Sequence, residues 1–193
     1  MALAATLLLL AGGGSRRMGR PKALLPVGGA TLLEWIAERL APEFQGLLVA
    51  AREPEQVPPG LRPHFVPDLR PGAGPLAGIE AGLAATDHEA VFAVACDMPR
   101  VEPELARRLL AEAAGYDAAV PRVGGRPEPA CAAYRRSAAA GLSAALAEGR
   151  WKAADALAGL RVRWLDGEDP TAFANLNTPE DYGAFLDAMR KRR

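Results

Sequence analysis

A glycine-rich segment near the amino terminus combines residue types that suit phosphate binding. It extends from Leu10 to Lys22 and reads Leu-Ala-Gly-Gly-Gly-Ser-Arg-Arg-Met-Gly-Arg-Pro-Lys. Glycines allow positive φ angles and let the backbone approach a phosphate closely, and successive N–H groups can form a concavity that binds anions. Arg17 adds positive charge, and Lys22 supplies a compact ammonium group suited to a phosphate oxygen. We therefore predict a loop that binds phosphate groups.

Two well-known glycine motifs do not describe this segment. It lacks the Gly-x-x-x-x-Gly-Lys-Ser/Thr form of the P-loop, and it lacks the dinucleotide fingerprint with its acidic residue at the proper distance. A turn with a purely structural role is the alternative for Gly12 to Gly14 taken alone. Phosphate binding is favoured over that alternative by the combination with Ser15, Arg17, Met18, Gly19 and Lys22.

Asp97 directly follows a continuous apolar run, residues 91–96. A carboxylate at the end of a buried strand stays ionised only if it is solvated, hydrogen-bonded or bound to a cation. Mg2+ favours one or two carboxylates together with water and phosphate oxygens. Beside a phosphate-binding loop, Asp97 therefore predicts a magnesium ligand, whereas a turn aspartate that caps local N–H groups is the alternative.

The remaining polar candidates are less specific. Residues 68–79 are rich in turn formers and lead into a helix start at Pro75, whose N–H groups could hold another anion. An ordinary loop is the alternative. His64 and His88 stand apart and lack the spacing of metal ligands, so we interpret both as structural or exposed. The sequence supports no Ser-His-Asp or Cys-His arrangement.

Periodicity and end signals predict the elements that must position these residues. Apolar runs typical of buried strands lie at 6–11, 46–51, 64–66, 91–96, 117–121, 130–134 and 162–165. Capping and proline signals predict helices over 31–40, 75–85, 102–113, 137–147 and 153–157, and a final helix after 178.

The alternation of strands and helices predicts an α/β fold of three layers, with a mainly parallel central sheet and helices on both faces. In such sheets, ligands bind beyond the carboxyl ends of the strands. We see no linker or internal repeat and expect residues 1–193 to form a single domain.

Composition limits the class of partner. The 193 residues include 23 basic and 23 acidic side chains, so no global field favours nucleic acid or an anionic membrane. The apolar run 2–10 is too short to span a bilayer and lacks the features of a signal peptide. Cys96 and Cys131 lie in apolar runs and are expected to be buried thiols, which fits the cytoplasm. We expect a monomer.

The loop signature resembles that of the MobA-like nucleotidyltransferases. The matching residues read Leu10-Ala11-Gly12-Gly13-x-Ser15-x-Arg17-Met18-Gly19-x-x-Lys22-Ala23-Leu24-Leu25. Further segments match in the same order as in the family: Asp68, then Gly74-Pro75-Leu76-Ala77-Gly78, Asp97-Met98-Pro99 and Asn175-x-Asn177-Thr178-Pro179-Glu180. The resemblance covers nearly the whole chain and implies a Rossmann-like nucleotidyltransferase fold.

The resemblance also implies roles for individual residues. Lys22, Asp97 and Arg17 would act in catalysis, with Asp97 as the Mg2+ ligand. The residues implied to contact the nucleotide are Leu10, Ala11, Gly12, Gly13, Lys22, Asp68 and Gly78. Asn175 and Asn177 would face the site from the acceptor side. The resemblance thus implies that the amino-terminal part of the domain binds the nucleotide and the carboxyl-terminal part the acceptor.

Within the family, the pattern is most similar to enzymes that transfer GMP from GTP to molybdopterin. Such a protein would make transient contacts with other proteins of cofactor biosynthesis. Pro21 departs from this pattern and is more usual in cytidylyl relatives, and Ala51 replaces a common base-contacting asparagine. A cytidylyltransferase, or a nucleotidyltransferase for another phosphorylated acceptor, is therefore the alternative. A non-catalytic nucleotide-binding protein is the third hypothesis.

Overall fold

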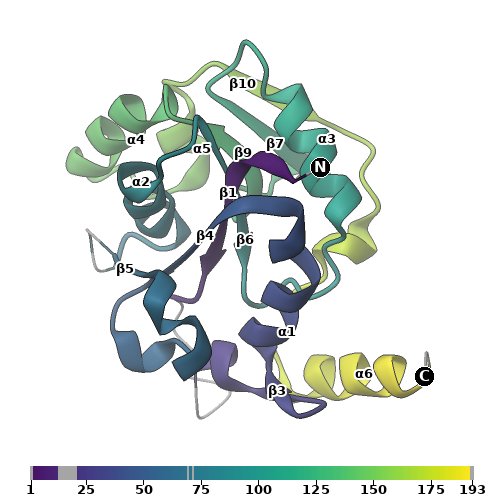
Figure 1. Cartoon of the computed structure of the whole chain (residues 1–193). Helices are drawn as coiled ribbons and strands as arrows, with labels where there is room; N and C mark the ends of the chain where they lie inside the picture. The colour runs from purple at the N-terminus through teal and green to yellow at the C-terminus, as the bar shows by residue number, and fades with distance from the viewer. Residues whose placement is uncertain (1, 13–20, 69, 71, 192–193) are drawn as a thin grey trace.

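A central sheet organises the chain in a computed structural model that describes residues 2–12, 21–68, 70 and 72–191 (Figure 1). Its strands are β1 (Leu3–Leu10), β4 (Phe44–Ala51), β5 (Phe65–Pro67), β6 (Ala90–Ala95), β7 (Ala118–Val123), β8 (Arg126–Pro127), β9 (Cys131–Arg135) and β10 (Val162–Leu165). The strand order is β10-β7-β9-β6-β1-β4-β5, and β8 pairs with β7. A small hairpin, β2 (Pro26–Val27) with β3 (Ala30–Thr31), was not predicted.

The sheet is mainly parallel, as predicted. Strand β1 lies between β4 and β6 and is parallel to both, and β5 is parallel to β4. Strand β9 is antiparallel to both of its neighbours, β6 and β7, while β10 is parallel to β7. The reversed strand β9 therefore presents its amino end at the edge where the parallel strands end.

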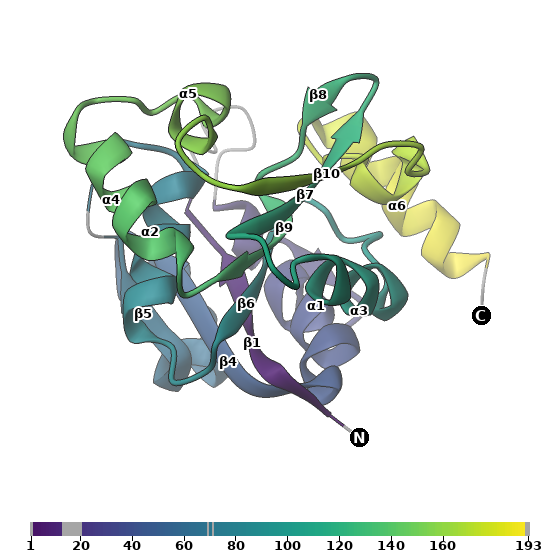
Figure 2. The same cartoon turned by 90° about the horizontal axis from the view of Figure 1, so that it is seen from above.

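Helices cover both faces of the sheet. They are α1 (Leu32–Leu40), α2 (Pro75–Ala85), α3 (Pro103–Glu112), α4 (Ala138–Ala147), α5 (Ala153–Leu157) and α6 (Pro179–Arg190). Figure 2 shows α2 and α4 on one side of the sheet and α1 and α3 on the other. The fold is therefore the three-layer, Rossmann-like α/β class that the sequence predicts.

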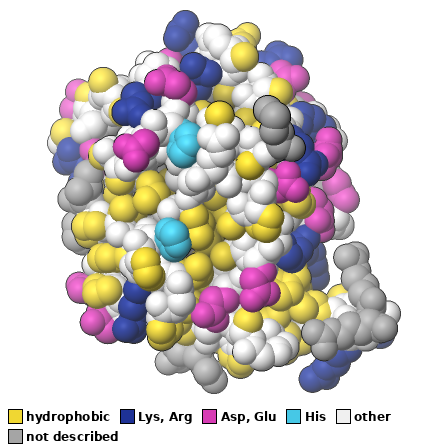
Figure 3. Space-filling model, viewed as in Figure 1, with side chains coloured by type: hydrophobic (Ala, Val, Ile, Leu, Met, Phe, Trp, Pro, Cys, Tyr) yellow, Lys and Arg dark blue, Asp and Glu magenta, His cyan; other side chains and the backbone are white. Residues whose placement is uncertain are grey.

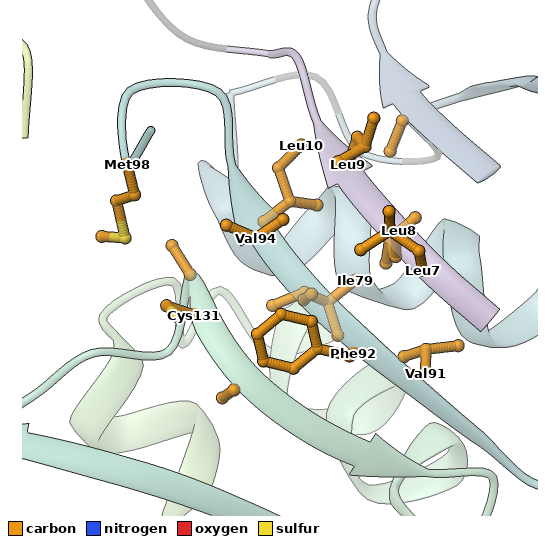
Figure 4. Close-up of a cluster of buried hydrophobic side chains, with 14 of the residues drawn as sticks. Leu7, Leu8, Leu9, Leu10, Ile79, Val91, Phe92, Val94, Met98 and Cys131 are labelled. Carbon is orange, nitrogen blue, oxygen red and sulfur yellow. The ribbon is translucent and has the colours of Figure 1, made fainter. Parts of the chain in front are cut away.

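The core is built on the apolar run of β1. Leu7, Leu8 and Leu9 are fully buried because both faces of this central strand are covered by helices. Figure 4 shows them packed with side chains of β6, α2 and β9, among them Phe92 and Ile79. Burying each such side chain contributes roughly 1.5–3 kcal/mol, so this packing fixes the strand ends from which the site is built.

Two helix starts follow their sequence signals closely. Thr31 Oγ1 accepts a hydrogen bond from Glu34 N, and the Glu34 carboxylate accepts one from Thr31 N. Thr178 and Asp181 form the same reciprocal box at α6. Each box satisfies N–H groups that otherwise lack partners at a helix start, and the second one fixes the chain that carries Asn177.

Helix α2 approaches β1 so closely that Gly82 has no room for a side chain. A Cβ atom there would lie 2.3 Å from Leu8 Cδ2. We expect Gly82→Ala to lower the free energy of unfolding by about 1–3 kcal/mol, because overpacking forces the core to shift. Chemical denaturation measures the change. Gly183→Ala in α6 is the matched control, since nothing lies within 4 Å, and it should be neutral or slightly stabilising. An equal loss of stability in both variants would contradict the explanation by overpacking at Gly82.

Asp117 joins β7 to the turn before β10. Its carboxylate accepts hydrogen bonds from the Arg161 backbone N–H at 2.9 Å, from the Arg161 guanidinium at 3.1 Å and from Ser137 Oγ at 2.7 Å. The bonds from Arg161, helped by Ser137, lower the pKa of Asp117 from 3.8 to about 2. When the pKa of a carboxyl group is lower in the folded than in the unfolded protein, its ionised form stabilises the fold at any pH above the unfolded-state pKa. This stabilisation is lost as the pH falls through the pKa of the folded state.

The stabilisation from Asp117 should therefore be complete above about pH 5 and should disappear between about pH 4 and pH 2. Arg161 is largely exposed, so solvent screening limits the expected effect to roughly 1–2 kcal/mol. Unfolding titrations of the wild type and Asp117→Asn across this range measure it. A stability difference that does not shrink as pH falls would rule out this account.

The distribution of surface charge and the burial of the two cysteines are as the composition predicts. Figure 3 shows acidic and basic side chains interspersed over the face that is seen there. Cys96 and Cys131 are buried and unpaired, as predicted. Among the described residues, no helix is long and apolar enough to cross a membrane.

Candidate active site

A cavity of about 520 Å³ opens at the carboxyl edge of the parallel strands. Its walls contain seven of the residues that the sequence proposed for the site. The complete described lining is Leu10, Ala11, Gly12, Lys22, Arg52, Asp68, Gly72, Gly74, Pro75, Ala95, Cys96, Asp97, Met98, Glu128, Pro129, Ala130 and Asn175.

The register of the sheet explains why these residues meet. Leu10 pairs with Ala50 of β4 and with Ala95 of β6, so the three strands end at one level. The ladder continues one step further through hydrogen bonds from Ala11 N to the Ala50 carbonyl and from Cys96 N to the Leu10 carbonyl. The residues that follow each strand are therefore brought to the same edge, as expected for a ligand site in an open parallel sheet.

Lys22 and Asp97 form the charged centre of the cavity. Lys22 Nζ lies 2.8 Å from Asp97 Oδ2 and donates a second hydrogen bond, also of 2.8 Å, to Asn177 Oδ1. The two charged side chains are only 16% and 22% exposed, so solvent screens their interaction incompletely. Three segments far apart in the sequence thus converge on one ammonium group.

The segment before α6 is anchored to the Asp97 turn. Leu176 N donates to the Asp97 carbonyl at 2.9 Å, which places Asn175 and Asn177 on either side of that link. Asn175 lines the cavity, and its Oδ1 atom is buried without a hydrogen-bond partner among the described residues. An unsatisfied buried oxygen is costly, so Asn175 offers an acceptor ready for a cation or a ligand donor.

Asp68 closes the opposite wall. Its backbone N–H donates to the Ala51 carbonyl at 2.9 Å, which extends the pairing of β4 and β5 by one residue. Its carboxylate lies against the backbone of Gly12, where a Cβ atom would be 3.1 Å from Oδ2. Burial raises the pKa of Asp68, and the nearby Arg52 charge partly opposes this. A desolvated carboxylate of this kind is suited to accept hydrogen bonds from a sugar or a base.

Glu128 brings a third carboxylate to the cavity. It lies just before β9, and Ala130 accepts a hydrogen bond of 2.8 Å from Ala95 N, which fixes this turn to the end of β6. Burial, and then the charge of Asp97, raise the pKa of Glu128. The proximity of two carboxylates is unfavourable unless a cation is shared or a proton is held.

Arg52 and Glu128 were not singled out from the sequence. Arg52 follows β4 at the carboxyl edge, a position that could have suggested it. Glu128 lies just before the strand predicted at 130–134, in a segment where we proposed no site residue. Its location depends on the reversed direction of β9, which the apolar pattern of that strand does not reveal.

Gly78 lies beneath the cavity wall and is absent from its described lining. A Cβ atom there would lie 2.9 Å from Leu10 Cδ2 and 3.1 Å from Ala50 Cβ. The structure thus places Gly78 at a close approach of α2 to the sheet. Gly13 and Arg17, also proposed from the sequence, lie outside the described residues.

Cys96 lines the cavity but is not suited to act as a nucleophile. Burial, reinforced by the charge of Asp97, raises its pKa to about 12, and the thiolate is the reactive form. Its side chain packs in the core.

A second hollow of about 480 Å³ lies between α1 and α6, against the other side of the turn that follows Asp97. Its lining includes Trp35, Phe185 and Met189. The residues proposed for chemistry line the cavity at the strand ends instead, so we assign the candidate site there.

An open, mainly parallel sheet with a lysine, carboxylates and glycine backbone at its carboxyl edge defines a Rossmann-like nucleotide-binding enzyme fold. The family model for the MobA-like NTP transferase domain matches residues 7–163. The chain belongs to this family and is a nucleotidyltransferase.

The names of similar proteins are consistent with membership of this family. A probable molybdenum cofactor guanylyltransferase of Pelotomaculum thermopropionicum is 38% identical over 93% of this chain and 90% of its own length. The molybdopterin-guanine dinucleotide biosynthesis protein A of Archaeoglobus fulgidus superposes with a TM-score of 0.82 at 32% identity, covering 96% of this chain and 99% of that one.

A cytidylyltransferase has a similar fold. The 2-C-methyl-D-erythritol 4-phosphate cytidylyltransferase of Thermus thermophilus superposes with a TM-score of 0.70 at 26% identity, and covers 95% of this chain and 98% of its own. Nucleotidyltransferases of this family generally use a divalent metal.

Proposed function

We propose that this protein transfers GMP from GTP to molybdopterin, with release of pyrophosphate. The observation that carries the proposal is the convergence of Lys22, Asp97 and Asp68 on one cavity at the strand ends. Relatives named molybdenum cofactor guanylyltransferase match over more than nine-tenths of the chain, which supports the choice of substrates.

The reaction needs positioning and charge neutralisation more than proton transfer. The terminal phosphate oxygen of molybdopterin is already a nucleophile at neutral pH, so it can attack the α-phosphorus of GTP without a histidine or serine base. Lys22 would bind the phosphates that leave as pyrophosphate and stabilise their developing charge. Asp68 and the backbone at Leu10 to Gly12 would orient the nucleoside, so that the attack is in line.

Mg2+ is the divalent metal that we propose for this site. The donor set fits, because Asp97 and Glu128 offer carboxylate oxygens and Asn175 has a buried oxygen without a described partner. Hard oxygen ligands are those that Mg2+ favours. Bound there, the metal would polarise the α-phosphate and neutralise negative charge. Asp97 is the residue that would hold the metal, while Asn175 and Asn177 would form the acceptor side of the site.

The assignment of GTP can be tested directly. With Mg2+ and molybdopterin, the purified protein should release pyrophosphate from GTP faster than from CTP, UTP or ATP, and GTP should give the largest thermal shift. The cytidylyl alternative, favoured by Pro21 and Ala51, predicts that CTP is preferred in both assays. No pyrophosphate from any nucleotide would favour the non-catalytic hypothesis and overturn this proposal.

We further propose that residues 1–193 form one domain and that the protein works as a cytoplasmic monomer with transient partners in cofactor biosynthesis. One sheet includes strands from both parts of the chain, from β1 to β10. The rings of Trp35 in α1 and Phe185 in α6 pack edge to face at 5.3 Å, which ties the carboxyl-terminal helix to the first one. The two unpaired thiols suit a reducing compartment.

A further inference from the structure

Helix α2 contains a buried carboxylate that the proposed mechanism does not use. Glu80 is 7% exposed and belongs to a helix whose other residues are apolar or small. A buried charge is unfavourable unless it is paired. Its partner is Arg70, whose Nε lies 3.0 Å from Glu80 Oε2 and 3.3 Å from Oε1.

Arg70 belongs to the connector between β5 and α2, which forms a wall of the nucleotide cavity. Residues of this connector that line the cavity are Asp68, Gly72 and Gly74. Gly72 and Gly74 adopt positive φ angles, of 100° and 67°, and glycines lose much conformational entropy when they are ordered. Ordering these two glycines therefore costs conformational entropy, which a contact to the rest of the protein can offset.

The described contacts show how the connector is held. It starts with the hydrogen bond from Asp68 N to the Ala51 carbonyl and turns through a bond of 3.1 Å from Ala73 N to the Arg70 carbonyl. Between these points, the Arg70 side chain extends away from the cavity to Glu80, and its Nη2 lies 3.5 Å from Ser143 Oγ of α4. The ion pair thus joins the cavity wall to the helical layer behind it.

We propose that the Arg70–Glu80 ion pair positions Asp68 and thereby sets the affinity for the nucleotide. The Asp68 carboxylate packs against two glycines, since a Cβ atom would lie 3.1 Å from Oδ2 at Gly12 and 3.4 Å from Oδ1 at Gly78. Arg70 and Glu80 are positioning residues, since neither lines the cavity among the described residues. The inference rests on the proposed function, because it assigns the nucleotide to the cavity wall that carries Asp68.

The test compares nucleotide binding with stability. Glu80→Gln keeps the shape of the side chain and removes its charge, while Arg70 can reach solvent. Calorimetry with Mg2+ and GTP, without acceptor, should show a Kd about tenfold higher, equivalent to about 1.4 kcal/mol, and kcat at saturating GTP should change less than threefold. Glu112→Gln, which breaks the exposed pair with Arg163, is the matched control and should leave Kd unchanged.

A double-mutant cycle distinguishes positioning from a general loss of structure. Asp68→Asn should weaken binding less in the Glu80→Gln background than in the wild type, because the carboxylate is already displaced. Additive effects, or an unchanged Kd with a lowered unfolding temperature, would overturn the proposal. If Glu80→Gln fails to fold, Arg70→Gln together with Glu80→Gln removes both charges, and the same Kd comparison applies.

The two hypotheses can fail separately. If the wild type prefers another nucleotide, the GTP assignment fails, and the same variants are then measured with the preferred one. If the wild type binds GTP as proposed and Glu80→Gln binds it equally well, only the positioning role of the ion pair is wrong.

Discussion

Asp97→Asn should reduce the rate of pyrophosphate release by about 10³-fold or more. The substitution keeps the size of the side chain but removes the charge that would hold the metal, and losses of one aligned electrostatic group cost about 10²–10³-fold. The loss should exceed that range because Lys22, at 2.8 Å from Asp97, also loses its ionic partner. Steady-state rates with saturating GTP, Mg2+ and molybdopterin measure the effect.

Metal binding gives a readout that is independent of turnover. Titration with Mn2+ should show weaker binding to Asp97→Asn in the presence of GTP than to the wild type. Asp187→Asn is the control, since Asp187 lies on the exposed side of α6 and pairs only with Arg190 among the described residues. A variant at position 97 that keeps a tenth of the wild-type rate would exclude Asp97 as the metal ligand.

Lys22→Met should lower kcat/KM for GTP by about 10²–10³-fold, because a fixed ammonium beside the leaving phosphates is replaced by an apolar side chain. Lys22→Arg should recover only part of this loss. The cavity holds the ammonium as a point donor between Asp97 and Asn177, and the planar guanidinium cannot reproduce that geometry.

Comparison of Lys22 with Lys191 separates the effect of position from that of charge. Lys191→Met at the end of α6 removes the same charge far from the cavity and should leave kcat/KM unchanged. A defect of similar size at positions 22 and 191 would show that net charge, rather than contact with phosphate, explains the loss. Full activity of Lys22→Arg would show that any cation at this position is sufficient.

Periodic patterns predicted the sheet and its helices well because buried parallel strands and capped helices have strong local signals. Helix α2 begins at Pro75 and ends at Ala85, as predicted, and the capping box at Thr31 is formed. Short elements without periodicity were missed, such as the hairpin of β2 and β3. Two or three residues cannot show a repeat, and their structure depends on tertiary contacts.

The site was predictable where a strand end carries a polar residue. Asp97 lies one residue beyond the end of β6, so the apolar run before it predicted its place at the edge. Asp68 directly follows β5, but it was proposed from the family resemblance. Glu128 could not be placed in this way, because the direction of β9 is set by pairing with β6 rather than by its own composition. The sequence also does not predict the ion pair of Arg70 and Glu80. The two residues are ten positions apart, one in a loop and the other in a helix, so no local pattern relates them.

The reversed strand β9 has an evolutionary consequence. The parallel half of the sheet would supply the wall of the proposed nucleotide site. Its strands end in a fixed register, so insertions there would disturb the core. The segment before β9 instead enters from the β7–β8 hairpin, whose turn at Gly124 and Gly125 can change length without altering any of those registers. We therefore expect homologues that use different acceptors to differ in the length of this hairpin. The parallel half of the sheet should keep the same strand lengths in all of them.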